Sequence, residues 1–253
     1  KLALVKLGVS HVQSQVMIKH IIIGSLKMHI NVAFQKVVDL LGENIAQAYL
    51  SRFRCIEKIP GADRIFERLT FATHREKLLD YLKEVDYTLV FLGLGFQIEI
   101  EPHGKQGPDL RVTRDGYQAL VEVTRFRPVN PGPPPEMDLS AEYGRKYGDP
   151  KRDTRKAMRK IYKKFPQVEV EKSIIAIWDD DEDMEEVEVK IAVRYLQKEE
   201  TLPKSLLFVL YGSPWYQHLN CFPLAKISAP HYSLWQRELE SFALKDIIQR
   251  ALV

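Results

Sequence analysis

The turn Arg114-Asp115-Gly116 is the feature that most constrains the fold of this 253-residue chain. Asp-Gly between two apolar-rich segments is a strong hairpin signal, because the central residues of such a turn adopt positive φ. We therefore predict strands at Asp109–Thr113 and Gln118–Phe126, joined by this turn. A further strand is expected at Phe96–Glu101, where FQIEIE alternates apolar and polar residues.

One helical pattern precedes these strands and another follows them. Apolar spacing predicts one or two helices from Arg64 to about Phe91, and Gly93 and Gly95 are expected to end them. The later segment Thr154–Phe165 is predicted to form a basic amphipathic helix, because its apolar residues recur at helical spacing.

The second helix has recognisable end signals, and further elements follow it. Asp153 is a suitable N-cap, and Pro166 is expected to stop the helix. Beyond it we predict buried strands at Ser173–Trp178 and Ser205–Tyr211, a helix at Val187–Leu196 and a final helix within Tyr232–Ala251. The αβββαβ order of the core elements predicts an α/β fold with a mixed central sheet flanked by helices.

Residues 1–62 are predicted to be an appendage to this unit. An extended segment to about Ile23 precedes a helical stretch, which Gly42 interrupts. Pro60-Gly61 is a turn signal and a plausible boundary. We therefore predict an N-terminal extended and helical appendage at 1–62 and a second domain at 63–253.

The composition argues against some classes of protein. The apolar stretches around Ile21–Ile23 and Leu89–Phe96 are too short to cross a bilayer. The two cysteines, Cys55 and Cys221, have no second Cys or His at metal-ligand spacing. These observations favour a cytoplasmic protein with reduced thiols and no membrane partner.

A basic stripe suggests a polyanionic partner. Ten basic and two acidic residues lie between Arg145 and Lys164, and an acidic block follows around Asp179–Asp183. DNA, or RNA, suits such a stripe, although a solvated helix face balanced by the acidic block is an equal alternative. The residues expected to contact nucleic acid are Lys105, Arg152, Arg155, Lys156, Arg159, Lys160 and Lys163.

Two carboxylates are expected to lie side by side at one end of the sheet. Asp109 starts one strand of the hairpin and Glu122 lies in the other. Since side chains two apart in a strand share a face, Glu122 and Thr124 point one way while Val123 and Arg125 point the other. Adjacent carboxylates repel unless they share a cation, and oxygen ligands suit Mg²⁺ or Mn²⁺.

This arrangement resembles the PD-(D/E)xK nuclease superfamily. Gly107-Pro108-Asp109 and Glu122-Val123-Thr124 lie on adjacent strands, between a first helix and a basic second helix, and the resemblance covers about residues 75–180. It implies a restriction-endonuclease-like core that hydrolyses phosphodiester bonds. It also implies that Asp109 and Glu122 bind the metal, with Glu84 of the first helix as a third ligand and Glu76 as the second choice.

The chain departs from the motif of this superfamily at Thr124, where the resemblance implies a catalytic lysine. A threonine hydroxyl can hold a water molecule but supplies no positive charge to the transition state. A lysine from elsewhere is therefore expected to replace it. Lys156 and Lys160, four apart on the second helix, are the first candidates, and Lys105 is another.

Two functional hypotheses follow from these residues. The first is a Mg²⁺-dependent DNA endonuclease in which Thr124 and a relocated lysine manage the nucleophile. The alternative is a catalytically inactive module of the same fold that binds nucleic acid or a protein partner. A homodimer is also plausible, because cutting two strands generally requires two active sites.

Overall fold

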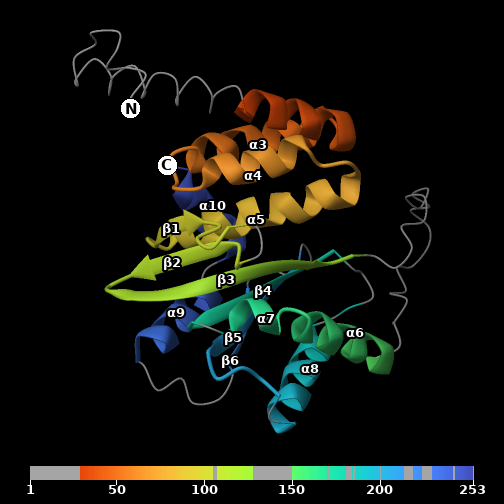
Figure 1. Cartoon of the computed structure of the whole chain (residues 1–253), viewed down its shortest axis with the longest axis vertical. Coiled ribbons are helices and arrows are strands. Elements are labelled where there is room, and N and C mark those ends of the chain that lie inside the picture. The colour runs from red at the N-terminus through yellow and green to blue at the C-terminus, as the bar shows by residue number, and fades with distance from the viewer. Residues whose placement is uncertain are drawn as a thin grey trace, which may run out of the picture.

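A six-stranded mixed sheet forms the centre of the molecule (Figure 1). The computed structural model describes residues 29–104, 107–127, 150–169, 171–180, 184, 186–199, 201–213, 219–223, 230–241 and 243–252. Lys105 and the expected extended segment before Ile23 lie outside these ranges. The strands run in the order β1 (Gln97–Ile100), β2 (Leu110–Arg114), β3 (Tyr117–Phe126), β4 (Ser173–Asp179), β5 (Leu206–Gly212) and β6 (Asn220–Pro223).

The predicted hairpin is present between β2 and β3. Arg114 pairs with Tyr117, and Asp115 and Gly116 adopt positive φ values of 54° and 79°. Two positive φ values in a two-residue loop are the type I′ geometry that matches strand twist. Strands β1 to β3 are antiparallel, β3 to β5 are parallel, and β6 returns antiparallel. The predicted α/β class with a mixed, helix-flanked sheet is confirmed.

Helices cover both faces of the sheet (Figure 1). On one side, α3 (Glu43–Ile56), α4 (Ala62–Thr70) and α10 (Leu244–Ala251) pack around α5 (Arg75–Gly93), which lies against the sheet. On the other side lie α6 (Pro150–Tyr162), α7 (Phe165–Val168) and α8 (Glu186–Lys198). A further helix covers residues 29–41, and α9 (Pro230–Ser241) contacts β6.

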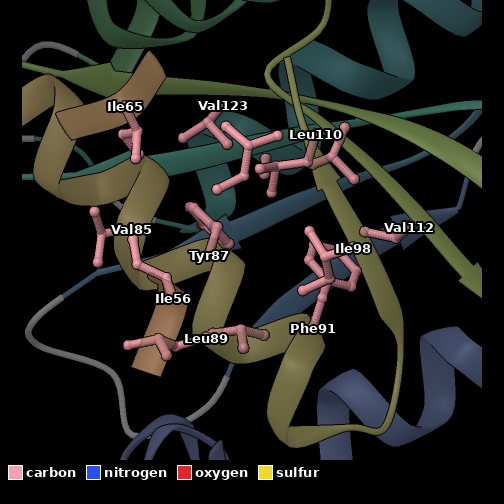
Figure 2. Close-up of a cluster of buried hydrophobic side chains, with 14 of the residues drawn as sticks. Ile56, Ile65, Val85, Tyr87, Leu89, Phe91, Ile98, Leu110, Val112 and Val123 are labelled. Carbon is pink, nitrogen blue, oxygen red and sulfur yellow. The ribbon is translucent and has the colours of Figure 1, made fainter. Parts of the chain in front are cut away.

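Each face has its own hydrophobic cluster. Figure 2 shows the larger cluster, in which Tyr87 and Phe91 of α5 lie near Leu110, Ile98 and Val123 of the strands. The smaller cluster joins α6 and α8 to the opposite face through Ala157, Ile161, Val189, Ala192, Ile175, Ile177 and Val209. Because β4 and β5 are buried along their whole length, they are nearly continuous apolar runs.

Gly61 brings α4 against the edge strand. Its φ is 85°, and a Cβ at this position would lie 2.1 Å from the Ile100 carbonyl oxygen. The backbone N–H of Ile100 also donates to the Pro60 carbonyl at 2.8 Å. Since only glycine fits this contact, the predicted boundary at Pro60-Gly61 is also the joint that places α4 beside the end of β1.

Several predicted boundaries were wrong. The basic helix begins at Pro150, so Asp153 lies in its first turn rather than at its N-cap. Proline fits this position because the first helical N–H has no partner within the helix. The helix ends at Tyr162, and Pro166 lies inside the short α7 instead of stopping it.

Other differences concern the number of elements. The segment before β1 forms two helices, α4 and α5, which agrees with the prediction of one or two. The C-terminal segment forms α9 and α10, where one helix was expected. Strand β6 was not predicted, because NCFP is too short to show alternation. None of the helices in the described ranges has a stretch apolar and long enough to span a bilayer.

Candidate functional site

A charged cavity of about 500 Å³ opens where β2 begins, beside the middle of β3. Helices α4 and α5 form one wall, and the end of α6 with the turn into α7 forms the other. Its lining includes the carboxylates of Glu84, Glu101, Asp109 and Glu122, and the cationic side chains of Arg68, Lys160 and Lys164. The structure thus brings together the three predicted metal ligands, Glu84, Asp109 and Glu122.

Asp109 lies immediately before β2 and is held by the neighbouring strand. Its Oδ2 accepts a hydrogen bond from the Val123 backbone N–H at 2.8 Å, and its carbonyl accepts one from Glu101 N at 2.7 Å. Burial raises the pKa of this carboxyl, although Arg68 acts in the opposite direction. The hairpin therefore fixes Asp109 next to Val123 and the following strand residues.

Glu122 is the most buried acid of the cavity, with a side chain 2% exposed. Lys164 Nζ donates to its Oε1 at 2.5 Å, whereas Oε2 has no hydrogen-bond partner among the described residues. Burial, followed by the charge of Asp109, raises the pKa of Glu122 to about 8, although Lys164 and Arg68 act in the opposite direction. This carboxyl is thus short of compensating charge.

Glu84 reaches the cavity from α5, as predicted. Arg68 Nη1 donates to its Oε1 at 3.2 Å, and Arg68 Nη2 donates to its Oε2. Burial, followed by the charge of Asp109, raises the pKa of Glu84 well above its ordinary value. The second choice, Glu76, instead forms an ion pair with Arg125.

Sequence reasoning missed Glu101 and Arg68. Glu101 directly follows β1 with a positive φ of 48°, and its side chain is 3% exposed. Arg68 Nε lies 3.0 Å from Glu101 Oε1, and neither Glu101 oxygen accepts a hydrogen bond from a described residue. Arg68 also stacks over Tyr81, with its guanidinium carbon 4.9 Å from the ring centre. No recognisable motif marks either residue.

Thr124 and Arg125 lie on opposite faces of β3, as strand geometry predicts. Thr124 lies two residues from Glu122, and both Thr124 and Arg125 line the cavity. Arg125 bonds to Glu76, Asp80 and Asp180, so all three of its guanidinium nitrogens are engaged. Arg125 therefore does not provide the charge that Thr124 lacks.

Among the lysines that the structure describes, Lys164 contacts Glu122, and it lies in the turn between α6 and α7. Lys160 lines the same cavity, and burial followed by the charge of Lys164 lowers its pKa to about 8. Lys156, the other first candidate for the substitute lysine, donates to the Arg127 carbonyl at 3.3 Å and does not line the cavity. Continuing the four-residue spacing of Lys156 and Lys160 by one step would have found Lys164.

Four further basic residues of the stripe face solvent. Arg152, Arg155, Arg159 and Lys163 are exposed on α6 and the turn that follows it. They share one side of the helix, because they are spaced by three or four residues. This exposed row ends beside the cavity, since Lys163 adjoins Lys164.

The geometry does not converge on a preformed metal site. Among the residues that the structure describes, no group of three His, Cys, Asp or Glu side chains is placed to hold one ion. The physical reason is visible in the contacts, since Arg68 and Lys164 lie between the carboxylates and neutralise part of their charge.

Comparisons of the chain with protein-family models, with curated proteins and with solved structures gave no significant match. The chemistry of the cavity must therefore be judged from its own residues.

Proposed function

We propose that this protein is a nuclease that hydrolyses phosphodiester bonds in DNA with a divalent metal ion, built on a restriction-endonuclease-like core. The observation that carries the proposal is the contact of Lys164 with Glu122. Lys164 places an ammonium group beside Glu122. This positive charge is the one that the motif lysine would supply and that Thr124 does not carry. A phosphoryl-transfer site requires such a charge near the attacking water.

The carboxylate oxygens of the cavity are of the chemical type that Mg²⁺ or Mn²⁺ prefers, although in this structure they do not converge on one point. Glu122 Oε2 and both oxygens of Glu101 are buried without a hydrogen-bond partner among the described residues, and such groups are costly unless a ligand compensates them. Asp109, Glu122 and Glu84 would hold the ion, because hard cations prefer carboxylate oxygens. When bound, the ion would polarise the phosphate and lower the pKa of a bound water.

The protein's own side chains account for the remaining chemistry. Lys164 keeps positive charge beside Glu122, where charge develops on the attacked phosphate. Thr124, on the same face of β3, offers a hydroxyl that orients a water molecule. Lys160 adds a second cation in the same wall and is mainly protonated below its pKa of about 8.

The exposed row on α6 suits the backbone of a DNA strand. Arg152, Arg155, Arg159 and Lys163 form a basic surface that leads to the cavity. Arginine and lysine on a helix bind phosphates with little regard to sequence, and each contact releases counterions. We therefore infer that this row positions the strand and that the cavity receives the scissile phosphate.

The test is cleavage of supercoiled and branched DNA with Mg²⁺ or Mn²⁺. We expect the wild-type chain to cut both in the presence of the ion, and Asp109→Ala and Glu122→Ala to cut neither. Activity that survives both substitutions would overturn the assignment. Folding of each variant is checked by circular dichroism, so that loss of activity is not loss of structure.

Thr124→Lys distinguishes an active enzyme from an inert binding module. In an active site that uses Lys164, a second ammonium beside Glu122 displaces the water-binding hydroxyl, so activity falls. A chain without activity that gains it on this substitution would instead be a binding module that has lost its lysine. The Lys164 contact favours the first outcome.

A further inference from the structure

Arg68 occupies the middle of the carboxylate cluster. Its two Nη atoms donate to the two oxygens of Glu84, and its Nε lies 3.0 Å from Glu101 Oε1. Its Nη1 also lies 3.7 Å from Asp109 Oδ1. One guanidinium therefore lies close to three of the six acids that line the cavity, and its side chain is only 17% exposed.

A guanidinium in this place and a divalent ion compete for the same oxygens. The bidentate contact with Glu84 uses both carboxylate oxygens, which are then not directed at a shared point with Asp109. Buried carboxylates need a counter-charge in either state, because removing one partner of a buried pair is strongly destabilising. Arg68 supplies that charge when no ion is bound.

We propose that Arg68 is the resident counter-ion of the cluster and that a divalent ion displaces it from Glu84 and Asp109. This inference rests on the proposed metal-dependent function. Glu101 retains Arg68 during the exchange, because it faces Nε and neither of its oxygens accepts a hydrogen bond from another described residue. The ring of Tyr81 lies under the guanidinium, and its contact with the guanidinium is kept while Arg68 moves away from Glu84.

The exchange gives Arg68 a second role. Once released from Glu84, its two Nη groups present a planar pair of donors to the cavity, a geometry that matches phosphate oxygens. The same arginine thus contacts carboxylates without the ion and faces the substrate phosphate with it. Ion binding and phosphate binding are therefore coupled through one side chain.

The exchange has a measurable consequence for metal affinity. The ion binds only to molecules in which Arg68 has left Glu84. If only a fraction of the molecules is in that state, the apparent affinity of the protein for the ion is reduced by that fraction. Removing Arg68 leaves every molecule competent, so the ion binds more tightly. A purely structural arginine predicts the opposite, because its loss would loosen the carboxylates that hold the ion.

Arg52 offers a matched control elsewhere in the molecule. It pairs with the buried Asp86 and stacks over Tyr49 with its guanidinium carbon 4.6 Å from the ring centre, much as Arg68 does with Glu84 and Tyr81. It does not line the cavity. A general effect of losing a part-buried arginine appears in both variants, whereas competition for the ion appears only at Arg68.

The experiment measures Mn²⁺ binding to the full chain by calorimetry and by electron paramagnetic resonance, without DNA. We expect Arg68→Gln to bind Mn²⁺ at least about tenfold more tightly than the wild type, and Arg52→Gln to bind as the wild type does. Binding by Arg68→Gln that equals or falls below that of the wild type would overturn the exchange while leaving the metal site intact. No binding by either chain would overturn the metal site itself.

A measurement on the wild type covers the case in which Arg68→Gln does not fold. Arginine Nε–Hε signals are followed by nuclear magnetic resonance during titration with Mg²⁺, and the Arg68 signal is assigned from the conservative variant Arg68→Lys. The exchange predicts that the Arg68 signal shifts and saturates with the ion while the Arg52 signal stays in place. An Arg68 signal that is unchanged at saturating Mg²⁺ would overturn the proposal.

Discussion

Two groups of acids meet at the cavity beside β3, one around Arg125 and one around Arg68, and they balance their charge differently. Around Arg125, the acids Glu76 and Asp80 keep side chains 33% and 22% exposed, so water solvates the charge that the arginine leaves over. Around Arg68, the side chains of Glu101 and Glu122 are 3% and 2% exposed, and three of their oxygens have no hydrogen-bond partner among the described residues.

The difference separates a cluster that stabilises the fold from the cluster for which we propose a chemical role. The Arg125 cluster is complete as it stands, because every guanidinium nitrogen of Arg125 has a partner. The Arg68 cluster carries buried, incompletely compensated carboxylates whose pKa values are raised. Buried carboxylates of this kind lower the stability of the folded state, and they are typical of functional sites.

The sharpest contrast is predicted for Glu122→Gln. It removes a metal ligand, so cleavage should fall by at least about 10³-fold, because the metal is worth several kcal/mol to the transition state. The free energy of unfolding, measured with urea and without metal, should stay the same or rise. The variant buries a neutral amide in place of an acid whose charge is incompletely compensated. A stability loss as large as that of a core deletion would place Glu122 with the structural cluster instead.

Arg125→Gln should give the reverse pattern. Loss of the guanidinium leaves Glu76, Asp80 and Asp180 without their shared partner, and we expect a stability loss of about 3 kcal/mol in urea unfolding. Cleavage per folded molecule should stay close to that of the wild type. A large fall in cleavage with unchanged stability would contradict the division between the two clusters.

The basic row on α6 should act on binding rather than on chemistry. Replacing Arg155 and Arg159 by Gln removes two phosphate contacts, so the slope of log affinity against log salt should fall by about 2. Binding is measured by fluorescence anisotropy with Ca²⁺ in place of Mg²⁺, and Lys190→Gln and Arg194→Gln on α8 serve as controls. An unchanged slope would mean that the strand does not follow α6.

The smallest predicted effect is on pH dependence. Glu122 has a pKa of about 8 in the folded protein against 4.5 as its ordinary value, so the folded state holds a proton that the unfolded chain releases. Its contribution to stability is complete below pH 4.5 and is lost as pH rises through about 8. The wild-type melting temperature without metal should fall by roughly 3 °C from about pH 6 to about pH 8. Glu122→Gln should flatten this dependence, and a rising melting temperature in the wild type would contradict the shift.

Much of the fold followed from local patterns in the sequence. The turn at Asp115-Gly116 and the alternation before Glu101 predicted the antiparallel half of the sheet, because both depend on neighbouring residues. The start of α6 at Pro150 and the separation of α9 from α10 were missed. These boundaries depend on packing against the rest of the molecule. Local helix propensity is too weak to predict them.

The site was predictable only where a short motif marked it. Asp109, Glu122 and Glu84 lie together in one cavity, as spacing around the hairpin and the resemblance predicted. Arg68 and Glu101 carry no motif, and they reach the cavity because Gly61 fastens α4 to the end of β1. Lys164 was overlooked because the helix was expected to continue to Phe165. The helix instead ends at Tyr162, and the turn that follows it brings Lys164 to Glu122.

The most direct test of the central claim moves the positive charge that we propose for catalysis from the turn between α6 and α7 to β3. Lys164→Met should lower Mg²⁺-dependent cleavage of supercoiled DNA by about 10²-fold or more, in keeping with the loss of one charge-stabilising donor. Adding Thr124→Lys to that variant should restore much of the activity, since the ammonium then comes from the strand residue beside Glu122. Cleavage by Lys164→Met at the wild-type rate, or no gain on adding Thr124→Lys, would contradict the claim that Lys164 replaces the missing lysine.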